Sequence, residues 1–267
     1  MATESTVPNE ATLRALCADL LNDWHTTLAS ADGSMSLGRD DQDVDPVRFA
    51  TAFAFVAHAH HLVGTACRLL HERDYAAAVP LLRVAYESAV TAVWAADSPE
   101  AAKALELEML RGVKNLRTGL LETGLFEEVL ETFPEPTERL TKEDVTKEAQ
   151  AQSRRFNEMC DALEPEPVWL YQQFRLLSSY AHPSGSVINM FAPSGDEHLL
   201  ATPAAADVQA YLSWWFSAAM ILLHAGQALD RLDRDAKRAG TLAAAGELLG
   251  WETPLRLKSS VREALDD

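Results

Sequence analysis

The amino-acid sequence predicts an all-α protein: a single antiparallel bundle of about seven or eight helices, with peripheral helices and a long loop near residues 184–202. Apolar residues recur at intervals of three and four along most of the chain, which is the spacing of one helix face. No run of alternating β-branched residues indicates a strand. We expect the bundle domain to span residues 1–239 and a short helical tail to span 240–267.

The first four helices are expected at residues 8–31, 46–72, 75–94 and 99–123. A single apolar stripe predicts the first. Asp45 before Pro46 is an N-cap followed by proline at the first helical position, and it predicts the second. Asp74 opens the third, where Pro80 should either kink the helix or mark its true start. Ser98-Pro99-Glu100 repeats the cap-and-proline signal for the fourth.

The remaining helices are expected at residues 137–163, 167–182, 203–229 and from 240 onward. The first of these is highly charged, so we place it at the periphery. The third is the most apolar, but polar residues interrupt it too often for a membrane span, and we expect a buried helix. Gly250 and Pro254 interrupt the last.

Composition excludes several classes of protein. The 267 residues include 23 Lys and Arg against 40 Asp and Glu, a net charge of −17. Such a chain repels nucleic acid and anionic membranes at long range, so any contact with RNA has to be local. The start of the chain lacks the pattern of a signal peptide. Since three scattered cysteines suit a reducing compartment, we expect a cytoplasmic protein without a membrane partner.

Four polar side chains are predicted to share one helix face just before Pro183. Tyr171, Arg175, Ser178 and His182 fall within about 60° of one another at 100° per residue. An arginine can bind a phosphate in bidentate fashion, and a histidine can move a proton at neutral pH. Together they could let an RNA 2′-OH attack its own phosphate without a metal. The alternative is structural: Arg175 pairs with a buried carboxylate and His182 caps its helix.

The same residues resemble the HEPN superfamily (higher eukaryotes and prokaryotes nucleotide-binding). Arg175, six residues and His182 fit its R-x(4–6)-H motif, and Ser178 to Ser184 is similar to the S-x-x-x-H-P-S signature of bacterial HEPN-like families of unknown function. The resemblance covers about residues 45–226. It implies an antiparallel bundle that dimerises with the two motifs facing each other. Active members resemble metal-independent endoribonucleases of toxin–antitoxin and phage-defence systems.

The resemblance therefore implies Arg175 and His182 as catalytic residues, supported by Tyr171 and Ser178. RNA or a small anionic ligand would be bound, and a protein partner such as an antitoxin is open. A HEPN-like bundle that binds a nucleotide, an anion or a protein without catalysis is the alternative, as is a purely structural bundle.

An R-x-x-x-E pair, Arg83 and Glu87, lies on an earlier predicted helix and is shared with the same HEPN-like families. Residues four apart on a helix can pair with each other. The pair lies within an apolar stripe, so we expect it to be partly buried. Glu87 could then orient His182, as a supporting carboxylate does, or the pair could be a structural ion pair that fixes helix register.

A histidine cluster offers weak candidates for a metal site. His58 and His61 are three residues apart, and Cys67 and His71 are four apart on the same predicted helix. The two pairs point to different faces, and nothing specifies ligands from another helix, so we expect no metal. The phosphate-binding and dinucleotide-binding glycine motifs are missing, so no cofactor is expected either.

Consecutive aromatic residues begin the most apolar helix, at Tyr211 and Trp214-Trp215-Phe216. Because consecutive helical residues are about 100° apart, three of them cannot all face one core. We expect at least one to lie in a subunit interface or against Trp24, which favours a homodimer. The alternative is a central helix that is buried on all sides within one chain.

Overall fold

A computed structural model describes residues 8–29, 45–123, 140–165, 167–183, 185–192 and 208–266. Its elements are, in chain order, α1 (Glu10–Ala29), α2 (Pro46–His71), α3 (Tyr75–Asp97), α4 (Ala101–Thr123), the 3-10 turn η1 (Lys142–Asp144), α6 (Lys147–Arg154), α7 (Phe156–Asp161), β1 (Leu163–Glu164), α8 (Pro167–Ala181), α9 (Gly185–Phe191), α10 (Val208–Asp230), α11 (Ala239–Leu249), β2 (Arg256–Leu257) and α12 (Ser259–Asp266). The all-α prediction is confirmed.

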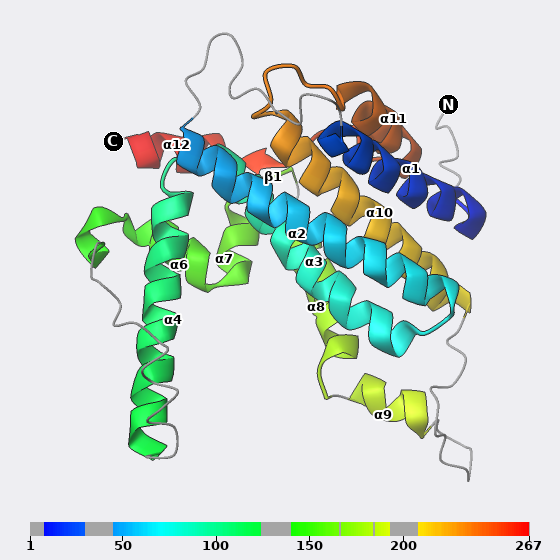
Figure 1. The fold of residues 1–267 in the computed structure, drawn as a ribbon, viewed down its shortest axis with the longest axis horizontal. Helices are drawn as coiled ribbons and strands as arrows, with labels where there is room; N and C mark the ends of the chain where they lie inside the picture. Colours follow the sequence, from blue (N-terminus) through cyan, green and yellow to red (C-terminus); the bar gives the residue numbers. More distant parts are fainter. Residues whose placement is uncertain are drawn as a thin grey trace.

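Helix α3 is the centre of the bundle. It packs against α2, α10 and α8, while α1 covers α10 on the outer side (Figure 1). Every residue from Ser88 to Ala96 is buried, so this part of the helix meets other elements all round. Among the described residues, α3 is also the helix whose length and composition would suit a membrane span. Its buried apolar residues are equally those of a core helix.

The predicted N-caps of α2 and α3 are confirmed. The Asp45 carboxylate accepts a hydrogen bond from the Val47 amide at 3.0 Å, and the Asp74 carboxylate accepts one from Ala77 at 3.1 Å. Each bond satisfies an amide that the first turn of a helix leaves without a partner. Pro80 does not start α3 but lies inside it. The hydrogen bond that Pro80 cannot donate would have ended in the first turn of the helix.

The charged segment expected as one peripheral helix over residues 137–163 is broken instead. Within its described part it forms η1, α6 and α7, because Val145 and Arg155 adopt extended backbone conformations that end each turn. The expected loop over 184–202 is also corrected, since α9 lies within it. The predicted positions 137–139 and 193–202 lie outside the described residues.

The C-terminal segment is part of the core. Leu242, Ala245 and Leu249 of α11 are buried in the same hydrophobic cluster as α1 and α10. Gly250 ends α11 in the left-handed conformation, with φ of 67°.

A short antiparallel sheet, which the sequence did not predict, joins the C-terminal segment to the middle of the chain. Leu163 of β1 pairs with Leu257 of β2. The Leu257 amide donates to the Asp97 carboxylate at the end of α3, at 2.8 Å. Strands of two residues are too short to carry an alternating pattern, which is why periodicity missed them.

Candidate functional site

The predicted polar face of α8 lies against α3. Helix α8 is anchored there by its buried residues Leu170 and Leu177 and by the Tyr86 hydroxyl, which donates to the Leu170 carbonyl at 2.8 Å. This anchoring turns Ser178 toward α3, where its hydroxyl accepts a hydrogen bond from Arg83 Nε at 3.1 Å. The serine of the S-x-x-x-H-P-S signature and the arginine of the R-x-x-x-E pair are therefore in direct contact.

Arg83 makes two further contacts. One of its terminal nitrogens pairs with the Glu87 carboxylate at 3.2 Å, as the spacing of four residues predicts. Its guanidinium also lies over the Phe174 ring of α8, 5.1 Å from the ring centroid. Both members of the ion pair are only partly exposed, at 21% and 30% of their side-chain areas. Arg83 thus links two helices through a hydroxyl, a carboxylate and an aromatic ring.

Glu87 is the electrostatically perturbed group of this contact. Burial raises the pKa of its carboxyl above the ordinary value, and the positive charges of Arg83 and His182 partly offset that rise. His182 is therefore near enough to Glu87 to interact with it electrostatically. In the described structure no hydrogen bond joins the two side chains.

The two residues expected to be catalytic lie on the solvent side of this contact. Arg175 and His182 are both exposed. Within the part of the chain that is described, the Arg175 guanidinium has no hydrogen bond or ion pair, so the pairing with a buried carboxylate is not seen. Tyr171 is partly buried and stacks on Phe174, with ring centroids 5.8 Å apart.

The structure thus brings Ser178, Arg83, Glu87 and His182 together and leaves Arg175 at the surface, where no described residue pairs with it. We call these five residues the α3–α8 seam. Phe174, which was not singled out from the sequence, belongs to the same contact through the Arg83 guanidinium. The sequence does indicate this position, because Phe174 follows Tyr171 by three residues and that spacing places both on the same helix face.

The histidine cluster does not converge. The Nδ1 atom of His58 lies 3.0 Å from the Ser88 hydroxyl, and His61 is exposed. Cys67 contacts Cys17 of α1, and this contact together with burial raises the pKa of the Cys17 thiol well above its usual range. In the described ranges, no three His, Cys, Asp or Glu side chains are grouped so that they could hold a metal ion.

Two tryptophans of the aromatic block are buried within the chain. Trp214 contacts Tyr180 edge to face, with centroids 5.1 Å apart, and Trp215 lies under the Arg14 guanidinium at 5.2 Å. Phe216 packs partly buried against the core. The side chain of Tyr211 lies outside the described residues. These tryptophans therefore complete the core of one chain and offer no evidence for a dimer.

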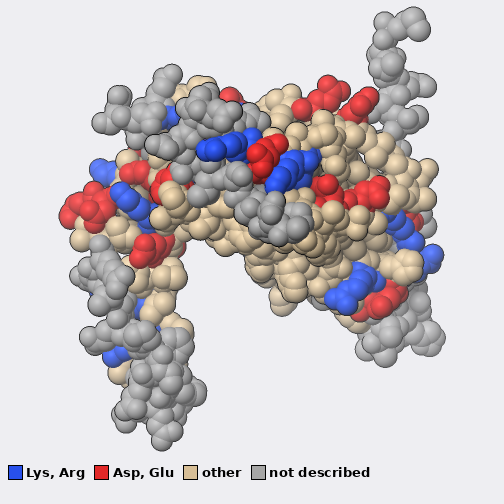
Figure 2. All heavy atoms as spheres, turned by 45° about the horizontal axis from the view of Figure 1, so that its top comes forward, with Lys and Arg blue, Asp and Glu red and all other residues tan. Residues whose placement is uncertain are grey.

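Charges of both signs are interspersed on the described surface. Figure 2 shows acidic and basic side chains next to one another on the upper part of the molecule, with a wide uncharged area below them. On this face, the described residues form no broad basic rim of the kind that would attract RNA from a distance.

Comparisons with known proteins identify a family. Neither the curated proteins nor the solved structures contain a match to this chain. One family, described as a family of unknown function (DUF5677), matches residues 49–198, which is more than half of the chain. The match includes most of α2 and the whole of α3 and α8, and therefore all residues of the α3–α8 seam. The chain belongs to the DUF5677 family.

Proposed function

We propose that this protein is a HEPN-like, metal-independent endoribonuclease whose reactive groups are Arg175 and His182. The observation that carries the proposal is the α3–α8 seam. A partly buried carboxylate, Glu87, and a motif serine, Ser178, both contact Arg83 below an exposed histidine of the same helix face. The exposed guanidinium of Arg175 lies at the surface of that face.

The chemistry follows from the two exposed side chains. The neutral imidazole of His182 would take the proton of an RNA 2′-OH as the oxygen attacks the adjacent phosphorus. The bond to the 5′ oxygen of the next nucleotide would break, and that oxygen would take up a proton. The products are a 2′,3′-cyclic phosphate and a 5′-OH end. Arg175 would neutralise the charge that develops on the phosphoryl oxygens.

Glu87 acts as a positioning residue in this proposal. Its carboxylate attracts the protonated imidazole that forms during proton transfer, and Arg83 fixes the carboxylate in place. Two copies of the chain would bring two such seams to one RNA strand. Arg175, His182 and the 40% exposed Leu176 lie at the surface, which is compatible with contact between two copies there. A cytoplasmic location, where RNA is available, belongs to the same proposal.

The test is cleavage of a labelled, mixed-sequence RNA in EDTA. Wild type should cut and leave 2′,3′-cyclic phosphate ends, whereas His182→Ala and Arg175→Ala should lose at least about a hundredfold in rate, the typical contribution of general acid–base catalysis. His25→Ala, which removes an exposed histidine of α1, is the matched control and should cut like wild type. If a folded wild type does not cut, or if all variants cut alike, the proposal is wrong.

The alternative is a bundle that binds RNA or another anion at the same face without cleaving it. The Arg175 guanidinium is exposed and has no partner among the described residues, which favours this alternative as much as it favours catalysis. Fluorescence anisotropy with a labelled RNA distinguishes the two. Binding that depends on Arg175 but not on His182, without cleavage, would establish the binding function.

A further inference from the structure

A second polar site lies away from the α3–α8 seam, on the side of helix α4. It is a pocket of about 370 Å³ between α4, the segment Leu140–Lys142 and α6. Four basic side chains line it: Arg111 and Lys114 of α4, Lys142, and Arg154 of α6. The chain as a whole has a net charge of −17, so a pocket lined by four basic side chains differs in charge from the rest of the protein.

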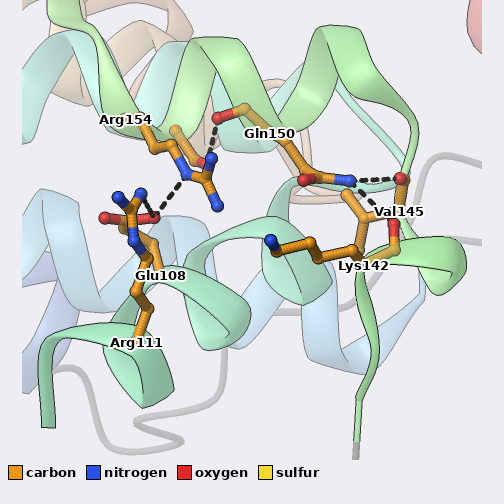
Figure 3. Close-up of polar contacts among 7 residues, drawn as sticks. Glu108, Arg111, Lys142, Val145, Gln150 and Arg154 are labelled. Carbon is orange, nitrogen blue, oxygen red and sulfur yellow. Dashed lines mark hydrogen bonds and ion pairs between the residues drawn. The ribbon is translucent and has the colours of Figure 1, made fainter. Parts of the chain in front are cut away.

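One carboxylate holds two of these cations. Glu108 of α4 accepts a hydrogen bond from Arg154 Nε at 2.8 Å, and one of its oxygens lies 3.5 Å from an Arg111 nitrogen (Figure 3). One carboxylate thus pairs with two guanidinium groups. Arg111 is nearly half exposed, at 47% of its side-chain area, so its guanidinium is open to a further partner.

Lys142 lies across the pocket from Glu108, Arg111 and Arg154. Its side chain extends toward Glu108 and the two arginines (Figure 3). Among the described residues, no hydrogen bond or ion pair involves its ammonium group. Lys114 is the fourth cation of the lining. An anion that enters the pocket would meet the ammonium group of Lys142 and the exposed part of the Arg111 guanidinium.

The backbone that presents Lys142 is held in place. The Gln150 side-chain amide donates to the Lys142 carbonyl at 2.7 Å and to the Val145 carbonyl at 2.8 Å (Figure 3). Thr141 and Asp144 close the turn with a reciprocal capping box. Lys142 is therefore presented by an ordered turn, which lowers the entropy lost when a ligand binds.

The remaining walls of the pocket are apolar. They are formed by Leu107, Leu110 and Leu140. Pockets for small molecules are mostly apolar with a few placed polar groups, and their volumes start at about 300 Å³. The combination therefore suits a ligand that has an anionic end and an apolar or planar body. A bare inorganic anion would leave the leucine walls unused.

We propose that the pocket between α4, Leu140–Lys142 and α6 binds a small phosphorylated molecule with an aromatic body, of the chemical class of a nucleotide. The phosphoryl oxygens contact Lys142 and Arg111, while the body lies against the leucine walls. Arg154 holds the Glu108 carboxylate, which in turn pairs with the Arg111 guanidinium. This site shares no residue with the α3–α8 seam and does not depend on RNA cleavage there.

Isothermal titration of the full chain with ATP, AMP and inorganic pyrophosphate tests the proposal. ATP should bind more tightly than pyrophosphate, because only ATP reaches the apolar walls, and the affinity should fall as salt rises. Lys142→Ala and Arg111→Ala should each weaken ATP binding about tenfold, which is the typical effect of one charge-assisted hydrogen bond.

Lys237→Ala is the matched control, because Lys237 is an exposed lysine of the α10–α11 turn that pairs with Asp235 at 3.5 Å. Its ATP affinity should equal that of wild type. If none of the three probes binds, the proposal is overturned. It is also overturned if the Lys142 and Lys237 variants bind ATP with equal affinity. A short single-stranded RNA that binds more tightly than ATP, with the same dependence on Lys142, would assign the pocket to RNA phosphates instead.

Discussion

The Nε atom of Arg83 lies 3.1 Å from the Ser178 hydroxyl, although the two residues are 95 positions apart in the chain. Together with the buried Leu170 and Leu177, this bond holds α8 on α3 in a fixed orientation. In that orientation Glu87 and His182 face the same region of the surface. The motif serine acts through this contact as a positioning residue, and Arg83 is the group on which the geometry of the α3–α8 seam depends.

Replacing Arg83 should destabilise the protein. Arg83→Met keeps the length of the side chain but leaves the Ser178 hydroxyl and the partly buried Glu87 carboxylate without their partner. We expect a loss of about 1–2 kcal/mol in the free energy of unfolding, measured by urea denaturation. Arg68→Met, at an exposed arginine of α2, is the control and should stay within about 0.5 kcal/mol. Equal effects of the two variants would show that Arg83 does not hold the helices together.

Glu87 should make the stability of the protein depend on pH between the ordinary carboxyl pKa of 4.5 and the raised value in the folded state. In that range the folded protein binds more protons than the unfolded chain, so stability falls as the pH rises. Glu87→Gln removes this effect. We expect the variant to gain stability relative to wild type between pH 4.5 and neutrality, measured by denaturation at several pH values. If Glu87→Gln is instead less stable than wild type in this pH range, the pairing of Glu87 with Arg83 contributes more to stability than burial of the carboxylate costs.

His60 should have the opposite influence. It is buried under Trp24, with ring centroids 4.4 Å apart, and burial lowers the pKa of its imidazole from 6.5 to about 3, with Arg238 adding to the shift. Since the unfolded chain then binds more protons between those values, stability falls as the pH drops below 6.5. Each such histidine contributes a slope of at most about 1.4 kcal/mol per pH unit.

His60→Leu should therefore flatten the acid side of the stability curve. His224, whose imidazole pKa is also lowered by burial to about 3, should behave alike. The double variant is expected to flatten the curve further than either single variant, as measured by thermal or urea unfolding at several pH values. Parallel curves for wild type and all three variants would show that these imidazoles titrate normally.

Two glycines of α11 provide a matched pair. A Cβ atom on Gly246 would lie 2.7 Å from the Trp251 carbonyl oxygen, whereas one on Gly240 would meet no atom within 4 Å. Gly246→Ala should therefore cost about 1–3 kcal/mol through overpacking against the backbone. Gly240→Ala should instead stabilise by about 0.5 kcal/mol, because alanine favours the helix. Differential scanning calorimetry of both variants measures the contrast, and a similar change in both would mean that Trp251 does not pack as described.

Local signals made the main helices predictable. Asp45 and Asp74 cap their own helices within three residues, so the information lies in neighbouring positions. The pairing of Leu163 with Leu257 joins segments that are far apart in the chain, and no proline or glycine marks the helix break at Arg155. Neither feature leaves a periodic pattern in a short segment, so the sequence analysis missed both.

The same division holds for the candidate sites. Helical spacing placed Ser178 and His182 on one face, and it paired Arg83 with Glu87. Neither spacing could show that Ser178 would contact Arg83, because that contact depends on how α8 docks on α3. The pocket around Lys142 was missed for the same reason: its basic residues come from three separate segments and form no motif.

The pairing of β1 with β2 has a consequence for the order in which the protein can fold as it leaves the ribosome. Helix α3 is made early, but its packing partner α10 and the strand that reaches Asp97 come from residues 208–230 and 256–257. Until those segments emerge, the side of α3 that packs against α10 stays uncovered. The nascent chain must therefore wait for residues 208–257 before these contacts can form, and in that interval it is open to chaperones and to aggregation.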